Sequence, residues 1–169
     1  MKILPAISLL DRPCLDRSFV EGYKQFRKYQ FSDAVARFQQ ALASTYKKDP
    51  YYALYLSYSG LASVYGGDSS GIVGLCRAAT QERQDAEVFV NLALGELQLS
   101  GRSRAVQALE KGKRLDPSNR NLNLICRHVG MRREPLIPMI SRNHPLNRML
   151  GRISYRKPIL RLAGNVAPR

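Results

Sequence analysis

The chain has 169 residues, of which 44% are hydrophobic and 24% charged, a composition typical of globular proteins and not of disordered or fibrous chains. Lys and Arg outnumber Asp and Glu by 27 to 13, which gives a formal net charge of +14. The excess is concentrated in residues 101–169, which hold 16 basic and 3 acidic side chains, against 11 and 10 in residues 1–100. Such a basic region favours an acidic partner, which is a nucleic acid, an anionic membrane or an acidic protein.

The cysteines and the N-terminus bear on the compartment. Cys14, Cys76 and Cys126 lie far apart, without the spacing of a metal site or a disulfide framework. Cys76 and Cys126 lie among apolar residues, which predicts buried thiols. The first residues, MKILPAISLLDRP, lack the long apolar region and cleavage site of a signal peptide, and no segment approaches the ~20 apolar residues of a membrane span. We expect a cytoplasmic protein without a metal or a cofactor.

Three segments share one spacing of small and large residues. In the first, Gly22 precedes Ala34 by twelve residues, and Phe38 and Ala41 follow. The other two copies place these residues at the same spacing: Gly60, Ile72, Cys76 and Ala79, then Ala93, Ala105, Leu109 and Gly112. A small residue lets a second helix cross the first closely, and a set at i, i+4 and i+7 shares one helix face. The spacing therefore predicts three helical hairpins.

Turn-prone segments separate the two helices of each copy, and each offers a Ser or Asp that could cap the second helix. They are residues 30–33, 66–70 and 100–103. Residues 66–71, GGDSSG, are similar to the surroundings of a serine-protease nucleophile. Because His128 and His144 both lie in the C-terminal third, we interpret this segment as a turn and not as a catalytic site.

Two prolines mark the ends of second helices. Pro50 follows the first copy and Pro117 follows the third. The first and second copies are offset by 38 residues, from Gly22 to Gly60, so we expect the second helix of the first copy to extend by one turn towards Lys48.

The pattern resembles the tetratricopeptide repeat (TPR), a helical hairpin of about 34 residues, and residues 86–117 are the most similar copy. The resemblance implies an all-α fold, a right-handed solenoid of about three TPR hairpins with C-terminal capping helices. The expected boundaries are an N-terminal segment at 1–14, repeats over 15–118 (about 15–50, 53–85 and 86–118), basic capping helices over 119–157 and a tail at 158–169. Residues 121–131 would be the first capping helix.

The resemblance also implies a ligand site, because the first helices of TPR proteins line a concave groove. The corresponding residues here are mostly apolar and aromatic: Phe19, Tyr23, Phe26, Leu54, Ser57, Tyr58, Leu61, Tyr65, Val90, Asn91, Leu94 and Gln98. Such a lining suits an extended or helical peptide with hydrophobic side chains. Self-filling by residues 3–10, ILPAISLL, or by a second copy of the chain stays open.

Chaperone-binding members of the family hold a free carboxylate with a clamp of Lys, Asn and Arg. The corresponding places hold Phe19, Tyr23, Tyr58, Glu87 and Asn91. The resemblance thus implies that this clamp is absent and that capture of a C-terminal carboxylate is not the function.

The basic C-terminal third offers a second surface. Its residues are Arg127, Arg132, Arg133, Arg142, Arg148, Arg152, Arg156 and Lys157. We interpret them as the polar outer face of capping helices. Binding of nucleic acid or of an anionic membrane is the alternative, although Tyr155 alone supplies an aromatic ring for stacking there.

These observations predict a non-enzymatic protein-interaction module, an adaptor or chaperone-like scaffold. Its partner would be another protein or peptide, with acidic partners favoured by the charge and a homodimer as a further option.

Overall fold

The computed structural model describes residues 12–131; residues 1–11 and 132–169 lie outside the described part. Seven α-helices and no strand are present in this part, which confirms the all-α prediction. They are α1 (Arg17–Arg27), α2 (Phe31–Ser44), α3 (Tyr52–Gly66), α4 (Gly71–Gln81), α5 (Ala86–Gln98), α6 (Arg102–Leu115) and α7 (Arg120–His128).

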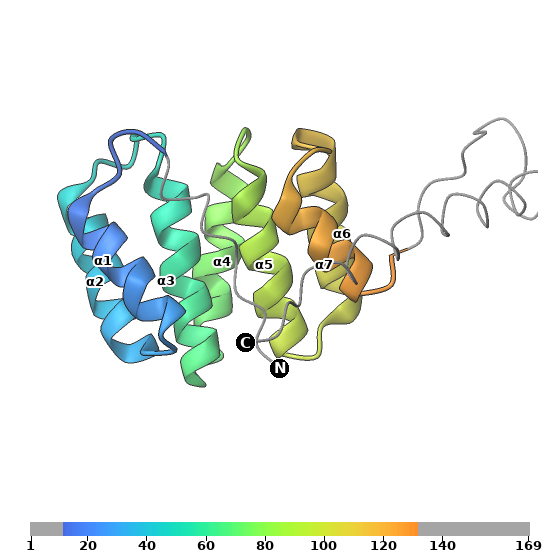
Figure 1. The fold of residues 1–169 in the computed structure, drawn as a ribbon, viewed down its shortest axis with the longest axis horizontal. Helices are drawn as coiled ribbons and strands as arrows, with labels where there is room; N and C mark the ends of the chain where they lie inside the picture. Colours follow the sequence, from blue (N-terminus) through green and yellow to red (C-terminus); the bar gives the residue numbers. More distant parts are fainter. Residues whose placement is uncertain (1–11, 132–169) are drawn as a thin grey trace, which may run out of the picture. The chain divides into compact units, whose positions relative to one another are not determined.

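Consecutive helices pair into the hairpins α1–α2, α3–α4 and α5–α6, which stand side by side in chain order (Figure 1). Helix α3 also packs against α2 and α5, and α5 also packs against α4 and α7. The helix expected after the third repeat is present as α7, which buries Leu122 and Ile125. The rest of the expected capping region and the tail fall outside the described residues.

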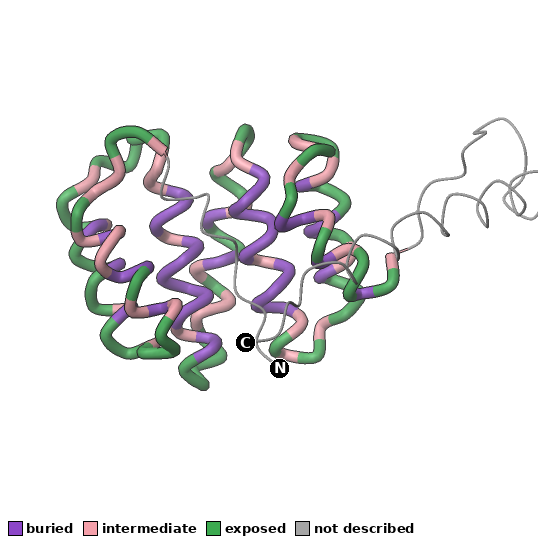
Figure 2. The backbone as a smooth tube through the Cα atoms, viewed as in Figure 1, coloured by how far each residue is buried: buried purple, intermediate pink, exposed green. Residues whose placement is uncertain are grey.

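The core runs along the inner first helices. Figure 2 shows buried residues over the whole length of α3 and α5, with exposed residues mainly in the loops and outer helices. Helix α3 has no charged residue among its 15, and 11 of them are buried. A helix that is apolar on all sides is stable only in an interior position. The sequence of α3 therefore requires cover on every face.

Aromatic rings fill the space between the first two hairpins. The ring of Tyr58 lies 5.5–6.0 Å, centroid to centroid, from the rings of Phe19, Tyr23, Phe26 and Phe38. Three of the four contacts are edge-on or strongly inclined, an arrangement that aromatic rings favour. This cluster joins α1, α2 and α3 into one packing unit.

The predicted crossing in the first hairpin is confirmed. A Cβ atom on Gly22 would lie 2.9 Å from Cβ of Arg37 and 3.0 Å from the ring of Phe38, so only glycine allows α1 and α2 this approach. Ala34 and Ala41, on the same face of α2 as Phe38, are buried.

The third hairpin follows the prediction as well. Ala93, Ala105, Leu109 and Gly112 are all buried. A Cβ atom on Gly112 would lie 2.6 Å from Cδ1 of Leu122. The small residue at this position thus admits the neighbouring helix α7, as expected of stacked hairpins.

The prediction for the second hairpin is wrong by one residue. Cys76 is exposed and Ile72 is only partly buried, whereas Leu75 and Ala78 are buried. The predicted burial of the Cys76 thiol is therefore wrong too; Cys126 is half-buried and Cys14 exposed.

Two glycines set this register. A Cβ atom on Gly60 would lie 2.7 Å from the carbonyl oxygen of Gly71, and one on Gly71 would lie 2.5 Å from the carbonyl oxygen of Gly60. The backbones of α3 and α4 are thus in direct contact at this pair. Gly71, Leu75 and Ala78 form the small–large–small set of α4, eleven residues after Gly60 instead of twelve.

One expectation about helix ends is wrong and another is confirmed. Helix α2 ends at Ser44 and does not reach Lys48, since Thr45 is extended (φ −111°, ψ 135°) and the Ser44 hydroxyl donates to Asp16 Oδ2 at 3.1 Å. Pro117, in contrast, follows the end of α6 as predicted.

The prediction that a Ser or Asp caps each second helix is wrong, and the first helix α3 also begins without a side-chain cap. Asp16, Asp85 and Asn119 accept hydrogen bonds from backbone N–H groups at the starts of α1, α5 and α7. Helices α2, α4 and α6 begin without such a bond.

Candidate functional site

The predicted groove residues all fall on the first helices α1, α3 and α5. Eleven of the twelve are buried, with exposed fractions of 4% or less, and Gln98 at the end of α5 is exposed. The structure thus places them along one set of helices, but in the interior. Their role in binding a ligand stays a prediction.

Some of these residues have a structural role in the core. The ring of Phe19 stacks on Tyr55 at 4.5 Å and lies 5.3 Å from Phe38, and the ring of Phe26 stacks on Tyr65 at 5.8 Å. These contacts hold the first hairpin to the second. Substituting Phe19 or Phe26 would therefore disturb folding before it reported on a ligand.

A smaller set remains as the candidate face. On α3, Leu54, Ser57 and Leu61 are spaced by i, i+3 and i+7, and on α5, Val90 and Leu94 are spaced by i and i+4, so each set lies along one side of its helix. We call these five residues the first-helix face. It carries no charge and, apart from the Ser57 hydroxyl, no polar side-chain group.

A polar contact links the two helices beneath this face. The Asn91 side chain donates from Nδ2 to Ser57 Oγ at 3.0 Å, and Ser57 Oγ donates to the Leu54 carbonyl oxygen at 2.7 Å. Within the described part of the chain, Asn91 Oδ1 is buried without a hydrogen-bond partner. The site therefore contains one unsatisfied acceptor, which is costly unless a donor reaches it.

A buried carboxylate lies at the start of α5. Glu87 is 2% exposed and accepts hydrogen bonds from the Tyr58 hydroxyl at 3.1 Å and from Asn121 Nδ2 at 2.9 and 3.0 Å. Burial raises the pKa of Glu87, although the hydrogen bonds from Asn121 and Tyr58 oppose that shift. Burial, together with the charge of Glu87, also raises the pKa of Tyr58 well above its usual value.

An ion pair adjoins this carboxylate. The Arg12 guanidinium donates from both terminal nitrogens to the carboxylate of Asp85, with Nη2 3.1 Å from Oδ1, and Asp85 also accepts from the Glu87 backbone N–H at 2.9 Å. The hydrogen bond to Asp85 raises the pKa of Arg12, against the opposing effect of its partial burial. Four residues later, the Asp16 backbone N–H donates to the Tyr55 hydroxyl at 2.9 Å.

These contacts place the segment before α1 across the N-terminal ends of α3 and α5. Sequence reasoning missed Arg12 and Asn121, because nothing local pairs residues that are 73 or 34 positions apart. Glu87 had been noted only as a departure from the carboxylate clamp. The structure shows an acidic pair, Asp85 and Glu87, in that neighbourhood.

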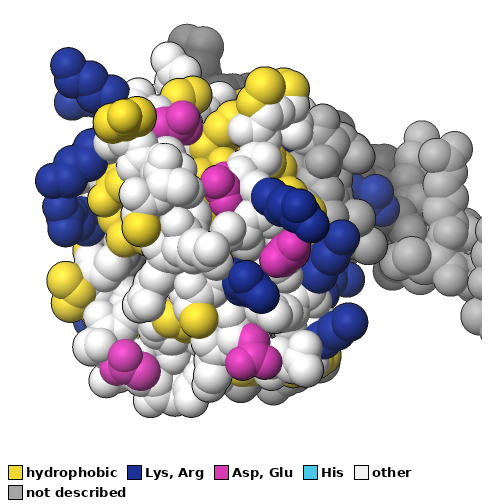
Figure 3. Space-filling view, turned by 90° about the vertical axis from the view of Figure 1, so that its left-hand side faces the viewer, with side chains coloured by type: hydrophobic (Ala, Val, Ile, Leu, Met, Phe, Trp, Pro, Cys, Tyr) yellow, Lys and Arg dark blue, Asp and Glu magenta, His cyan; other side chains and the backbone are white. Residues whose placement is uncertain are grey.

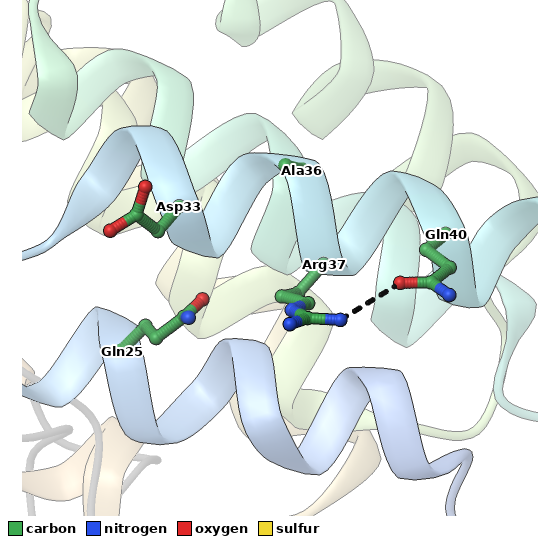
Figure 4. Close-up of a pocket in the computed structure, with 5 residues that line it drawn as sticks. All are labelled: Gln25, Asp33, Ala36, Arg37 and Gln40. Carbon is green, nitrogen blue, oxygen red and sulfur yellow. Dashed lines mark hydrogen bonds between the residues drawn. The ribbon is translucent and has the colours of Figure 1, made fainter.

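Open clefts are also present on the surface of the described residues. One, of about 300 Å³, lies between α1 and α2 and is lined by Gln25, Asp33, Ala36, Arg37 and Gln40 (Figure 4). Two of the lining residues on α2 are hydrogen-bonded to each other: Arg37 Nη1 donates to Gln40 Oε1 at 3.2 Å. The lining belongs to the two outermost helices and is polar and mixed in charge, so we do not associate it with the first-helix face.

The second cleft, of about 590 Å³, lies among the loops that precede α3, α5 and α7. Its charged lining has both signs, with Arg12, Lys48 and Arg83 beside Asp49 and Asp85. It is thus continuous with the Arg12–Asp85 ion pair at the N-terminal end of α5.

No His or Cys side chain lines either cleft. In residues 12–131, no group of three or more His, Cys, Asp and Glu side chains could hold a metal ion. The GGDSSG segment forms the predicted turn, with Gly67 at φ 103° and Asp68 accepting bonds from the Ser70 N–H and hydroxyl, each at 2.9 Å. No helix of the described part is long and apolar enough to cross a bilayer.

Charge on the described surface is mixed. On the end formed by α1 and α2, Lys and Arg side chains lie in separate groups at the left edge and over the right half of the view, with Asp and Glu side chains among them (Figure 3). Of the predicted basic surface, only Arg127 is described, exposed in the last turn of α7. Arg132, Arg133, Arg142, Arg148, Arg152, Arg156 and Lys157 lie outside the described residues.

Comparison with known proteins finds similar folds but no similar sequence. No protein-family model matches the sequence, and no curated protein is detectably similar to it. Among solved structures, the Sgt2 TPR domain from Aspergillus fumigatus matches with a TM-score of 0.57 and 18% identity, over 81% of this chain and 95% of that one.

The first TPR of Spaghetti (RPAP3), bound to the HSP90 peptide SRMEEVD, matches with a TM-score of 0.52 and 15% identity, over 67% of this chain and 87% of that one. The hairpins, their glycine and alanine crossings and these two matches agree. The chain therefore has the fold of a tetratricopeptide repeat domain.

Proposed function

We propose that this chain is a non-enzymatic protein-interaction module that binds an apolar peptide or protein segment along the first-helix face. The observation that carries the proposal is the uncharged character of that face on α3 and α5. These five residues occupy the positions that line the ligand groove in the family that the sequence resembles, and an uncharged lining there suits an apolar partner segment.

The acidic pair at the start of α5, Asp85 and Glu87, limits the charge that a ligand peptide could carry. The RPAP3 domain was solved with an acidic peptide, SRMEEVD. Here Asp85 and Glu87 would repel such a peptide, and Asp85 already binds a guanidinium from Arg12. A segment with apolar side chains and one basic residue, which would replace Arg12 at Asp85, complements the site in polarity and charge.

A peptide library displayed on phage tests the proposal. We expect selection on the full-length chain to enrich peptides with several apolar residues and one Lys or Arg, and calorimetry to show binding that persists in 0.5 M NaCl, as apolar burial is weakly salt-dependent. Enrichment of acidic or purely polar peptides would contradict the proposal. Loss of binding in high salt would instead favour contact through the basic C-terminal third.

Two exposed glutamines provide a matched pair of variants. Gln98 lies at the end of α5 beside the first-helix face, and Gln107 lies on the second helix α6. Gln98→Arg should weaken binding of the selected peptides about tenfold, whereas Gln107→Arg should leave it unchanged. Equal effects of the two substitutions would show that the peptides bind elsewhere.

A further inference from the structure

The positive charge of the described residues is concentrated on the last two helices. Residues 101–131 hold seven basic and two acidic side chains, whereas residues 12–100 hold ten and nine. The segment that forms α6 and α7 thus has a net charge of +5, against +1 for the five helices before it. Solvated surfaces normally mix both signs, as residues 12–100 do. The excess on α6 and α7 therefore needs an explanation of its own.

Three of the seven basic side chains have contacts or burial that account for them. Arg104 Nε donates to Oε2 of the buried Glu96 on α5 at 2.7 Å, and Arg102 Nη2 donates to the Val129 carbonyl oxygen at 2.8 Å. Lys113 is only partly exposed. These residues hold α6 to its neighbours and are not free for a ligand.

The other four basic side chains are exposed, and none of them belongs to an ion pair of the described residues. We call them the α6–α7 basic patch: Lys111, Arg114, Arg120 and Arg127.

Helix geometry groups the members of this patch. Lys111 and Arg114 are spaced by i and i+3 near the end of α6, so they lie on one side of that helix. Arg120 begins α7 after a loop of only four residues, 116–119. Arg127 follows at i+7, on the same side of α7 as Arg120 and about 10 Å further along it.

The position of Arg120 is unfavourable for the helix that contains it. Arg120 is the first residue of α7, where the helix dipole disfavours a cation, and no acidic residue lies in this first turn to compensate. A charge that costs stability locally and has no internal partner is a feature that proteins tolerate at functional sites. This placement supports a role for the patch in binding an anion.

The composition around the patch limits the kind of anion. Residues 101–131 contain no Phe, Tyr or Trp, so they offer no ring on which an unpaired base could stack. Leu115 and Leu124 are the large apolar side chains exposed there, which is little apolar surface for insertion into a membrane. Arg, which binds phosphate oxygens through two parallel hydrogen bonds, makes up three of the four patch residues.

A duplex nucleic acid fits these limits. It presents about one phosphate charge per 1.7 Å of its axis, so several phosphates lie within the length of the patch. Its bases are already paired and stacked, and binding through phosphates needs no aromatic side chain. The acidic side chains nearby, Glu110 and Asp116, are outnumbered by the four patch residues.

We propose that the α6–α7 basic patch contacts the phosphates of a double-stranded nucleic acid without reading its sequence. This site goes beyond the proposed function and does not depend on it, because the patch lies on α6 and α7 and the first-helix face lies on α3 and α5.

The salt dependence of duplex binding tests the proposal. Full-length protein is titrated into a fluorescent DNA or RNA duplex of about 20 base pairs at several NaCl concentrations. We expect a Kd of about 1–100 µM at 0.15 M NaCl and a steep linear fall of log K with log salt concentration. Absence of binding to both duplexes overturns the proposal.

Two triple variants with the same net charge locate the contact. Lys111→Gln/Arg114→Gln/Arg120→Gln removes three patch charges, and Lys24→Gln/Lys28→Gln/Arg77→Gln removes three exposed charges elsewhere. The patch variant should bind at least about tenfold more weakly, with a salt slope lower by about three, whereas the control variant should resemble the unmodified chain. Any contribution of residues 132–169 is common to all three proteins.

Other outcomes would contradict the proposal. Equal losses in the two variants, with helical content retained by circular dichroism, would show that net charge and not the patch governs binding. Tighter binding to vesicles with anionic lipid, or to a poly-glutamate peptide, than to either duplex would assign the patch to another partner. Selected apolar peptides should bind the patch variant unchanged, so the proposed function is tested separately.

Discussion

Replacing Gly60 by Ala tests the contact on which the second hairpin is built. The new Cβ would lie 2.7 Å from the carbonyl oxygen of Gly71 and 3.1 Å from the backbone N of Leu75. Ordinary contacts begin at 3.4 Å, so α3 and α4 would have to separate by about 0.7 Å. Backbone atoms cannot rotate away as a flexible side chain can, and the separation would open the packing around Leu75.

The magnitude follows from two opposed effects. Overpacking of this kind costs about 1–3 kcal/mol. Alanine is a better helix former than glycine, which stabilises the folded state by about 1 kcal/mol in the interior of α3. The difference of these two effects is a loss of about 0–2 kcal/mol in the free energy of unfolding for Gly60→Ala.

Gly74 provides the matched control on α4. A Cβ atom there would have its nearest neighbours at 3.8–4.0 Å, which is ordinary contact. Gly74→Ala should therefore raise the free energy of unfolding by about 0.5–1 kcal/mol, because only the helix propensity changes. Urea unfolding followed by circular dichroism at 222 nm measures both variants. A Gly60→Ala variant as stable as Gly74→Ala would refute the close crossing.

Three further predictions concern the second hairpin, the thiols and the buried carboxylate. Leu75→Ala should cost about 2–5 kcal/mol of unfolding free energy, while Cys76→Ala should change it by less than about 0.5 kcal/mol, as measured by urea unfolding. In the native protein, Cys14 and Cys76 should react quickly with a thiol reagent and Cys126 slowly, because burial raises the pKa of Cys126 and limits access, and mass spectrometry of timed samples follows this. Finally, the stability of Glu87→Gln relative to the unmodified chain should fall as the pH is lowered from 7 towards 4.5, as measured by urea unfolding at each pH.

The sign of the pH effect follows from the raised pKa of Glu87. Protonation of this carboxyl is easier in the folded state, so folding is favoured at low pH and the gain is lost as the pH rises through the folded-state pKa. Glutamine does not titrate and lacks this gain. A pH-independent difference between the two chains would contradict the assignment of Glu87 as a desolvated carboxylate.

Outcomes opposite to the first two of these predictions would restore the register inferred from spacing alone. If Cys76→Ala were as costly as Leu75→Ala, Cys76 would belong to the core. Slow labelling of Cys76 would point the same way, and an unfolded control sample, in which all three thiols react alike, shows that access and not chemistry limits the rate.

The crossings of the first and third hairpins could be predicted because they are local patterns. Gly22 with Phe38, and Ala93 with Leu109, combine one small residue in the first helix with one large residue on the facing side of the second. Helix periodicity alone brings such residues to one face. Turn-prone residues predicted the turn before α4, and Pro117 predicted the end of α6.

The register of the second hairpin could not be chosen in the same way. Two sets with identical spacing follow Gly60, one starting at Gly71 and one at Ile72. The choice depends on the contact between the backbones of Gly60 and Gly71, which buries Leu75 and exposes Cys76. That contact depends on how closely the two helices pack in three dimensions. The spacing of residues within either helix does not predict it.

The amino-acid sequence by itself determined the helical hairpins and the uncharged character of the first-helix face, since both depend on residue type at helical intervals. The contacts around that face and its burial were decided by the tertiary structure alone. It brought Arg12 to Asp85 and Asn121 to Glu87, and it buried the side chains that the family resemblance had placed in an open groove. Such contacts join residues far apart in the chain, and they form only when the stacked hairpins have set the distances between helix ends.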